Sequence, residues 1–327
     1  MGHRTVRIHH VGHIVENMTQ AISLYERLGF DVPPPNCPAM PRREGAAPEP
    51  FGAANTHADF ADSFLELATR VTEGDRGSLP ADTRLVPLEA PAEVVPLLVE
   101  RIGRTSADLA SRLDRFQGVH ILMFSSPAID EEAERLTGAG VRHGGINTVR
   151  RAAPEGAGVP VETIRYLEID GEGPGAGPGT VAEGRLGFVA DLDPDVQGAR
   201  RLDHPNGAVD LVEATLCVAD PELALVRRRY ETYLGRPARQ QGPAHVIDLD
   251  GAALRLVPGS ALATVLPGER PPALPAFVAY AVAVRDPVLT RDLLHRNGLP
   301  VRDTPTGDPF VPADAALGTA VVFRPAV

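Results

Sequence analysis

Two hydrophobic periodicities alternate along the chain, and the first switch between them falls within the first 30 residues. Apolar and polar positions alternate over residues 8–15, which predicts a strand with two distinct faces. Residues 17–30 then change to helical spacing, with Asn17 suited to cap the helix and Gly29 suited to end it. A short strand follows, so this stretch predicts a strand–helix–strand unit.

The same order of elements recurs three more times. New opening strands are predicted at residues 118–124, 209–218 and 276–284, and each is followed by a helical pattern and further strands. Repetition at this scale predicts an α+β fold made of four βαβββ modules.

Two segments interrupt the pattern. Residues 33–50 contain so much proline that we expect a long irregular loop, and a candidate lid. Residues 91–116 have helical periodicity, broken near Gly103, and are predicted to form a helical insert.

A glycine-rich stretch gives the strongest domain boundary. We expect an N-terminal domain at residues 1–175 (modules 1 and 2), a connecting segment at 176–209 and a C-terminal domain at 210–327 (modules 3 and 4).

Composition narrows the class of partner. The formal net charge of −11 argues against nucleic acid or an anionic membrane, and leaves a small-molecule substrate as the expected partner. The absence of a membrane-spanning apolar run or a secretory signal predicts a cytoplasmic protein, with Cys37 and Cys217 reduced. Monomer and homodimer both stay open.

Only modules 1 and 2 combine a histidine on the predicted opening strand with a glutamate on the predicted closing strand. The pairs are His10 with Glu66 and His120 with Glu168, at similar separations. Two imidazoles and two carboxylates form a ligand set for one divalent ion, and Zn, Ni, Co, Mn and Fe all remain open. Such an ion would polarise substrate oxygens.

Neighbouring side chains are the expected walls of this site. Substrate-binding positions are predicted at Phe64, Leu122, Phe124 and Tyr166, because apolar or amphipathic side chains typically line small-molecule pockets.

The residues that carry these patterns also resemble a known superfamily. IHHVGHIVENMTQAISLYERLGF resembles the opening of vicinal oxygen chelate proteins, which include glyoxalases, methylmalonyl-CoA epimerases, extradiol dioxygenases and drug-binding resistance proteins. The HPNGA turn and the Leu-Glu-Leu strand are similar to its glyoxalase-like branch. The resemblance implies modules paired into two curved, mixed-sheet half-barrels, with His10, Glu66, His120 and Glu168 as metal ligands.

This ligand set resembles that of glyoxalase I, which implies an isomerase or lyase with Glu168 as proton-shuttling base and Glu66 as its counterpart. An Fe(II) ring-cleaving dioxygenase is the first alternative. The later modules, where dioxygenases normally carry their ligands, have Glu213, Ala279 and Phe323 instead, which counts against it. The second alternative is a non-catalytic protein that binds a small drug.

Overall fold

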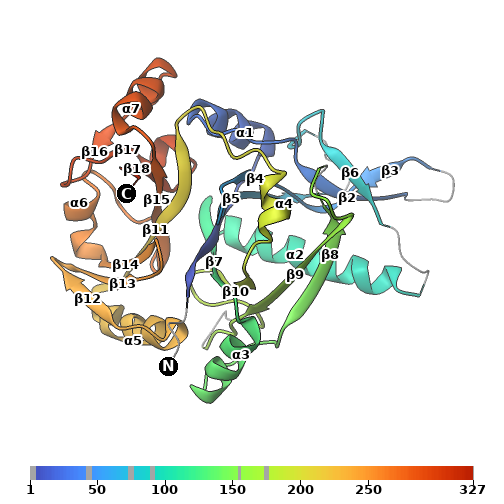
Figure 1. Cartoon of the computed structure of the whole chain (residues 1–327), viewed down its shortest axis with the longest axis horizontal. Coiled ribbons are helices and arrows are strands. Elements are labelled where there is room, and N and C mark those ends of the chain that lie inside the picture. Colours follow the sequence, from blue (N-terminus) through green and yellow to red (C-terminus); the bar gives the residue numbers. More distant parts are fainter. Residues whose placement is uncertain are drawn as a thin grey trace.

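The computed structural model describes residues 5–41, 46–72, 77–88, 93–153, 156–172 and 177–326. Their strands form two mixed sheets, one of ten strands and one of eight, which lie side by side with few helices around them (Figure 1). The predicted α+β architecture of four modules in two curved sheets is confirmed.

Modules 1 and 2 build the ten-stranded sheet. Module 1 consists of β1 (Arg7–Ile14), α1 (Met18–Arg27), β2 (Asn36–Pro41), β3 (Pro48–Pro50), β4 (Gly52–Asp59), β5 (Phe64–Val71) and β6 (Arg84–Pro87). Helix α2 (Val95–Leu113) leads to module 2, which consists of β7 (Gly118–Ser126), α3 (Ile129–Gly138), β8 (Asn147–Ala152), β9 (Val161–Glu168) and β10 (Arg185–Ala190).

Modules 3 and 4 build the eight-stranded sheet, which is reached through the short helix α4 (Pro194–Gly198). Module 3 consists of β11 (Ala208–Val218), α5 (Leu223–Leu234), β12 (Ala238–Gln241), β13 (Ala244–Asp248) and β14 (Ala253–Pro258), followed by α6 (Leu262–Val265). Module 4 consists of β15 (Ala276–Val284), α7 (Pro287–Arg296), β16 (Arg302–Asp303), β17 (Pro309–Val311) and β18 (Ala320–Pro325).

Local sequence explains where the first helix begins and ends. The Asn17 side chain accepts a hydrogen bond from the backbone N–H of Gln20 at 3.0 Å and so satisfies one free donor of α1. Gly29 follows the helix with φ of +85°, a conformation that is inexpensive only for glycine.

The modules share one connectivity. In each module the closing strand lies parallel beside the opening strand: β5 beside β1, β10 beside β7, β14 beside β11 and β18 beside β15. Opening strands pair antiparallel, β1 with β7 and β11 with β15. The pairing of module 1 with 2 and of module 3 with 4 follows from these contacts.

The closing strand of module 2 differs from the sequence prediction. Glu168, expected on the strand that closes the module, belongs to β9, and the parallel partner of β7 is β10. Strand β10 lies within residues 176–209, which were expected to connect the domains. The glycine-rich stretch therefore joins two strands of one sheet, and the N-terminal sheet extends to Ala190.

The proline-rich residues 33–50 are also more regular than predicted, since they contain β2 and β3. Both strands lie toward the edge of the sheet, where a proline that lacks an N–H does not interrupt a central ladder. Residues 42–45 of the candidate lid lie outside the described residues. Helix α2 falls within the predicted insert and runs without a break through Gly103.

The two sheets share a core. Buried apolar side chains from both pack together, and a chain of hydrogen bonds crosses from one half to the other: His13 Nδ1 to the Tyr25 hydroxyl at 2.9 Å, and that hydroxyl to the Tyr280 hydroxyl at 2.9 Å. One face of the N-terminal sheet is thereby covered, and its other face is left to form a site. No helix among the described residues combines the length and apolar character needed to cross a bilayer.

Candidate functional site

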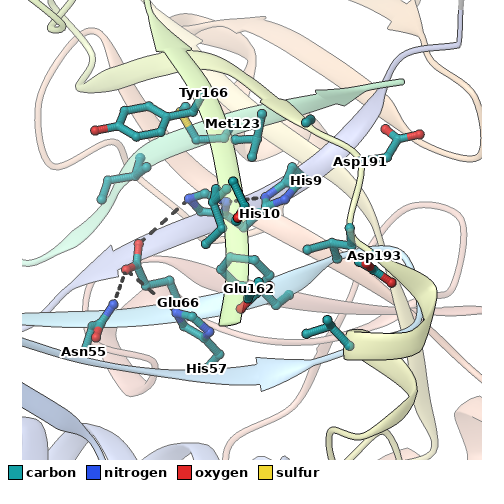
Figure 2. Close-up of a pocket in the computed structure, with 18 of the residues that line it drawn as sticks. His9, His10, Asn55, His57, Glu66, Met123, Glu162, Tyr166, Asp191 and Asp193 are labelled. Carbon is teal, nitrogen blue, oxygen red and sulfur yellow. Dashed lines mark hydrogen bonds and ion pairs between the residues drawn. The ribbon is translucent and has the colours of Figure 1, made fainter. Parts of the chain in front are cut away.

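A cavity of about 390 Å³ lies on the face of the N-terminal sheet that points away from the shared core (Figure 2). Strands β1, β4, β5, β7 and β9 contribute to it, and residues 189–196 border it. Apolar side chains from Phe64, Ile121, Met123, Ile164 and Val189 form part of its walls. About half of the lining residues are polar or charged, and they include Glu66, Glu162, Arg185, Asp191 and Asp193.

Glu66 is the central polar residue of this set. Its carboxylate lies 3.9 Å from His10 Nε2 on one side and 4.0 Å from His57 Nε2 on the other, and accepts a hydrogen bond from Asn55 Nδ2 at 3.0 Å. The strand order β4-β5-β1 produces this arrangement, because it places Glu66 on the strand between the two histidines. Figure 2 shows the carboxylate between both rings.

Phe64 separates the two histidines. Its ring stacks on His10, with centroids 4.5 Å apart, and on His57, with centroids 4.3 Å apart. Because the histidines come from strands on opposite sides of β5, their rings lie on opposite faces of Phe64. Both imidazoles are therefore contacted by the Phe64 ring and by the Glu66 carboxylate.

Further ionisable groups extend the row at both ends. His9 Nδ1 and His10 Nδ1 are 2.7 Å apart, so one ring donates a hydrogen bond to the other, and His10 presents its Nε2 to Glu66. At the other end His57 Nδ1 lies 4.0 Å from Asp59, which lies 3.9 Å from Arg200 Nε. The arrangement is suited to holding and moving protons.

His120 lies on the other face of the sheet. Its side chain is fully buried, its Nε2 is hydrogen-bonded to the Phe116 carbonyl at 2.8 Å, and its ring lies 4.2 Å from that of Phe116. Burial lowers its pKa to about 4. Alternation along β7 turns Ile121 and Met123 to the cavity and His120 away from it. The β1–β7 pairing is irregular at two points. Positions at the same distance from the ends of β1 and β7 can therefore point to opposite faces of the sheet, as His10 and His120 do.

Two of the predicted wall residues share the orientation of His120. Leu122 and Phe124 are completely buried in the core between the sheets, so the expectation that they contact substrate is corrected. Phe64 and Tyr166 line the cavity, and their role in substrate binding stays a prediction.

Glu168 is also separate from Glu66. It stands on β9 opposite Gly187 of β10, so it occupies the place that a β4 residue has in module 1. Its carboxylate accepts hydrogen bonds from the Arg185 guanidinium, one of them at 2.9 Å, and borders a neighbouring groove rather than the cavity. Tyr166 and Arg185 border both spaces.

The predicted four-residue metal set is therefore not assembled. His10 and Glu66 lie together, whereas His120 and Glu168 point elsewhere. Within the ranges that the structure describes, no three histidine, cysteine or carboxylate side chains gather as metal ligands. The donors as they lie do not fit a four-ligand divalent centre.

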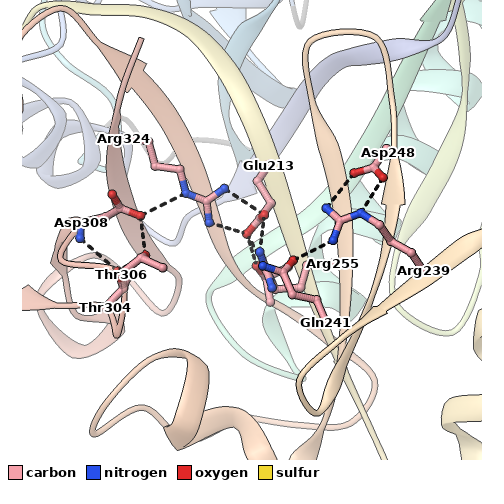
Figure 3. Close-up of polar contacts among 10 residues, drawn as sticks. Glu213, Arg239, Gln241, Asp248, Arg255, Thr304, Thr306, Asp308 and Arg324 are labelled. Carbon is pink, nitrogen blue, oxygen red and sulfur yellow. Dashed lines mark hydrogen bonds and ion pairs between the residues drawn. The ribbon is translucent and has the colours of Figure 1, made fainter. Parts of the chain in front are cut away.

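The C-terminal sheet carries a different arrangement on its opening strand. Glu213 of β11 accepts two hydrogen bonds from Arg255 and two from Arg324, at 2.9–3.0 Å (Figure 3). Burial alone would raise the pKa of Glu213, but the two arginines hold it below its usual range. The carboxylate is fully engaged by these cations, which suits a structural role.

Sequence reasoning missed His57 and Asn55. The sequence pattern could have revealed them, because Asn55, His57 and Asp59 occupy every second position and so share one face of a strand. His9 was missed because strict alternation assigns it to the opposite face from His10, whereas β1 is irregular between Ile8 and His10.

Comparison with known proteins gives one family. Residues 8–234 match a family model described as a glyoxalase-like domain. No curated protein matches significantly.

Three solved structures show the same overall fold. A hypothetical protein from Staphylococcus aureus is 8% identical, with a TM-score of 0.57, covering 98% of this chain and 100% of its own. A mutant of 4-hydroxymandelate synthase from Streptomyces coelicolor is 14% identical, with a TM-score of 0.54, covering 98% of this chain and 93% of its own. A fusion of a xylose isomerase-like TIM barrel with 4-hydroxyphenylpyruvate dioxygenase is 10% identical, with a TM-score of 0.53, covering 98% of this chain and 49% of its own.

Proposed function

The chain belongs to the glyoxalase-like domain family and has the fold of the vicinal oxygen chelate superfamily, and on this premise we propose that it is an acid–base isomerase or lyase. The substrate is a small oxygenated molecule held in the cavity around Glu66. The observation that carries the proposal is a carboxylate, 16% exposed, that lies within about 4 Å of two imidazoles in a cavity with partly apolar walls.

Glu66 is the general base in this proposal. It removes a proton from a substrate carbon next to a carbonyl group, and the electrons of the C–H bond move into the enolate. His10 or His57 donates a hydrogen bond to the enolate oxygen, and Asn55 orients the carboxylate. Return of the proton to the carbon skeleton gives an isomer, and loss of a leaving group gives a lyase product.

The apolar side chains of the cavity supply a second requirement, which is a low exposure of Glu66 to water. Phe64, Met123 and Val189 limit the access of water to Glu66, which strengthens its interaction with both histidines. Phe64 also fixes both imidazole planes by stacking, so the donors are in place before substrate enters.

The dioxygenase alternative has less support. In the C-terminal sheet, Glu213 is bound by Arg255 and Arg324, and the likeness to the synthase and dioxygenase structures, at 14% and 10% identity, extends to fold alone. The drug-binding alternative shares the same cavity and is distinguished by experiment, since it requires binding without proton transfer.

The test is proton exchange in D₂O. We expect the protein to exchange the carbon-bound proton of at least one member of a panel of small 2-hydroxy ketones and 2-oxo acids, followed by proton NMR. Glu66→Gln should lower the exchange rate by about 10²–10⁴-fold, because an amide does not accept the proton. Glu26→Gln on the exposed face of α1 is the matched control and should leave the rate unchanged.

Metal removal separates this proposal from the metal-dependent one. Protein dialysed against EDTA should keep its exchange rate. Loss of exchange with EDTA and its recovery with Zn²⁺, Ni²⁺, Co²⁺, Mn²⁺ or Fe²⁺ would contradict the metal-free mechanism. Tight ligand binding with no exchange anywhere in the panel would favour the drug-binding alternative.

A further inference from the structure

A groove beside the catalytic cavity is unusually rich in arginine for a chain with a net charge of −11. Five arginines and two carboxylates line it, leaving three positive charges in excess. Four of the arginines come from or directly follow α2, at spacings that place them on one side of the helix, and the fifth comes from β10: Arg101, Arg104, Arg112, Arg115 and Arg185.

The two carboxylates do not neutralise this groove. Asp108 is paired with Arg112 at 3.3 Å, and Glu168 is paired with Arg185. Within the part of the chain that the structure describes, Arg101 and Arg104 form no ion pair with a carboxylate, and both are exposed. The charge of Glu183 acts on Arg115 and partly offsets the burial that lowers the pKa of that arginine.

One arginine of the groove, Arg112, has a buried donor without a partner among the described residues. Arg112 is 7% exposed, and this donor is its Nε. Arg115 donates to the carbonyls of Ala182 and Pro275 at 2.8 and 2.9 Å. Burial and the nearby charge of Arg112 lower the pKa of Arg115. A buried cation with a free donor is costly, and an anion would offset that cost.

The groove adjoins the cavity around Glu66. Tyr166 and Arg185 border both, and Arg101 donates a hydrogen bond to the Tyr166 hydroxyl at 2.7 Å. A substrate with an apolar, oxygenated end beside Glu66 and an anionic end among the arginines passes these two side chains.

We propose that this arginine groove binds the oxyanion group of the substrate, a phosphate, a pyrophosphate or a carboxylate. Guanidinium groups suit this role, because they bind such oxyanions through pairs of N–H donors and stay charged at physiological pH. The assignment of the anion to the substrate depends on the proposed function, whereas binding of an anion to the groove does not.

The test uses inorganic pyrophosphate as the probe, titrated into the full chain by isothermal calorimetry at low ionic strength, with inorganic phosphate and malonate as separate arms. We expect one pyrophosphate per chain and weaker binding at higher salt. Stronger binding of malonate than of pyrophosphate would assign a carboxylate, and the reverse order a phosphorylated substrate.

Arginine variants test whether pyrophosphate binds in the groove. Arg101→Gln and Arg104→Gln, both on the exposed part of the groove, should each weaken pyrophosphate binding about tenfold. Arg228→Gln, an exposed arginine on α5 that removes the same charge, should bind as the unmodified chain does. No heat of binding at millimolar pyrophosphate, or equal weakening by Arg228→Gln, would overturn the proposal.

Glu66→Gln distinguishes the two proposals, since it should keep pyrophosphate binding while proton exchange is lost. Pyrophosphate binding that depends on Arg104, in a protein with no exchange activity, would leave the groove assigned and the acid–base function rejected.

Discussion

At the scale of single residues, the orientation of a side chain across its strand decides whether it belongs to the site. His10 and His120 both stand on opening strands, yet one lies at the cavity beside Glu66 and the other is buried against Phe116. The difference arises because successive side chains on a strand point to opposite faces, so a shift of one position exchanges cavity and core.

His120 and His13 give a prediction for the pH dependence of stability. Burial lowers the pKa of each from 6.5 to about 4. The unfolded chain therefore binds more protons than the folded chain between these values. Stability should be complete above pH 6.5 and fall as the pH drops toward 4, by up to about 1.4 kcal/mol per pH unit for each histidine.

The measurement is urea unfolding at several pH values. His120→Gln should reduce the slope of unfolding free energy against pH by up to about 1.4 kcal/mol per pH unit, the contribution of one proton. It should leave proton exchange at Glu66 intact. His295→Gln, exposed on α7, is the control and should leave the slope unchanged. Loss of exchange in a folded His120→Gln protein would restore this residue to the site.

At the scale of elements, the close approach of β10 to β9 fixes where module 2 ends. A Cβ built on Gly187 would lie 2.0 Å from the Leu167 carbonyl oxygen and 3.0 Å from the Glu168 Cα, so a side chain does not fit there. Gly187 therefore permits the pairing of β9 with β10 that separates Glu168 from the cavity. Glycine is required there because the strands pack closely, and not because of its backbone dihedral angles.

Gly187→Ala should therefore destabilise the protein by about 2 kcal/mol or more, because either β9 or β10 must move. Gly103→Ala is the matched control. Gly103 lies within α2 with open space around its Cβ position, and alanine there should stabilise the protein by about 0.5–1 kcal/mol. Thermal unfolding of both variants checks the pair, and similar melting temperatures would contradict the packing argument.

At the scale of the whole molecule, the two sheets resemble each other in topology and differ in what their outer faces hold. The N-terminal sheet presents Glu66 between two histidines and a cavity, whereas the C-terminal sheet presents Glu213 between two arginines. The arginines come from β14 and β18, so the cluster connects both modules of that half. The proposed acid–base site thus lies in one half, and the buried carboxylate–arginine cluster lies in the other.

Glu213→Gln should destabilise the protein by about 3 kcal/mol, because it leaves the partly buried Arg255 without its counter-charge and Arg324 with Asp308 alone. The lowered pKa of Glu213 means that this stabilisation is present above pH 4.5 and lost as the pH falls below it.

Denaturant unfolding at pH 7 measures the loss. Asp248→Asn, which breaks the exposed pair with Arg239, is the control and should change stability little. An equal effect of the two substitutions would contradict the structural role of the Glu213 cluster.

The sequence alone determined the four-module α+β fold and the start of α1 at Asn17, and it predicted that His10 and Glu66 lie together. These features follow from local periodicity, capping chemistry and repetition, which depend on residues close together in the sequence. The tertiary structure alone decided that β10 closes module 2, that His57 joins Glu66, and that His120 and Glu168 do not. Strand pairing and register set these outcomes, and they depend on contacts between residues far apart in the chain.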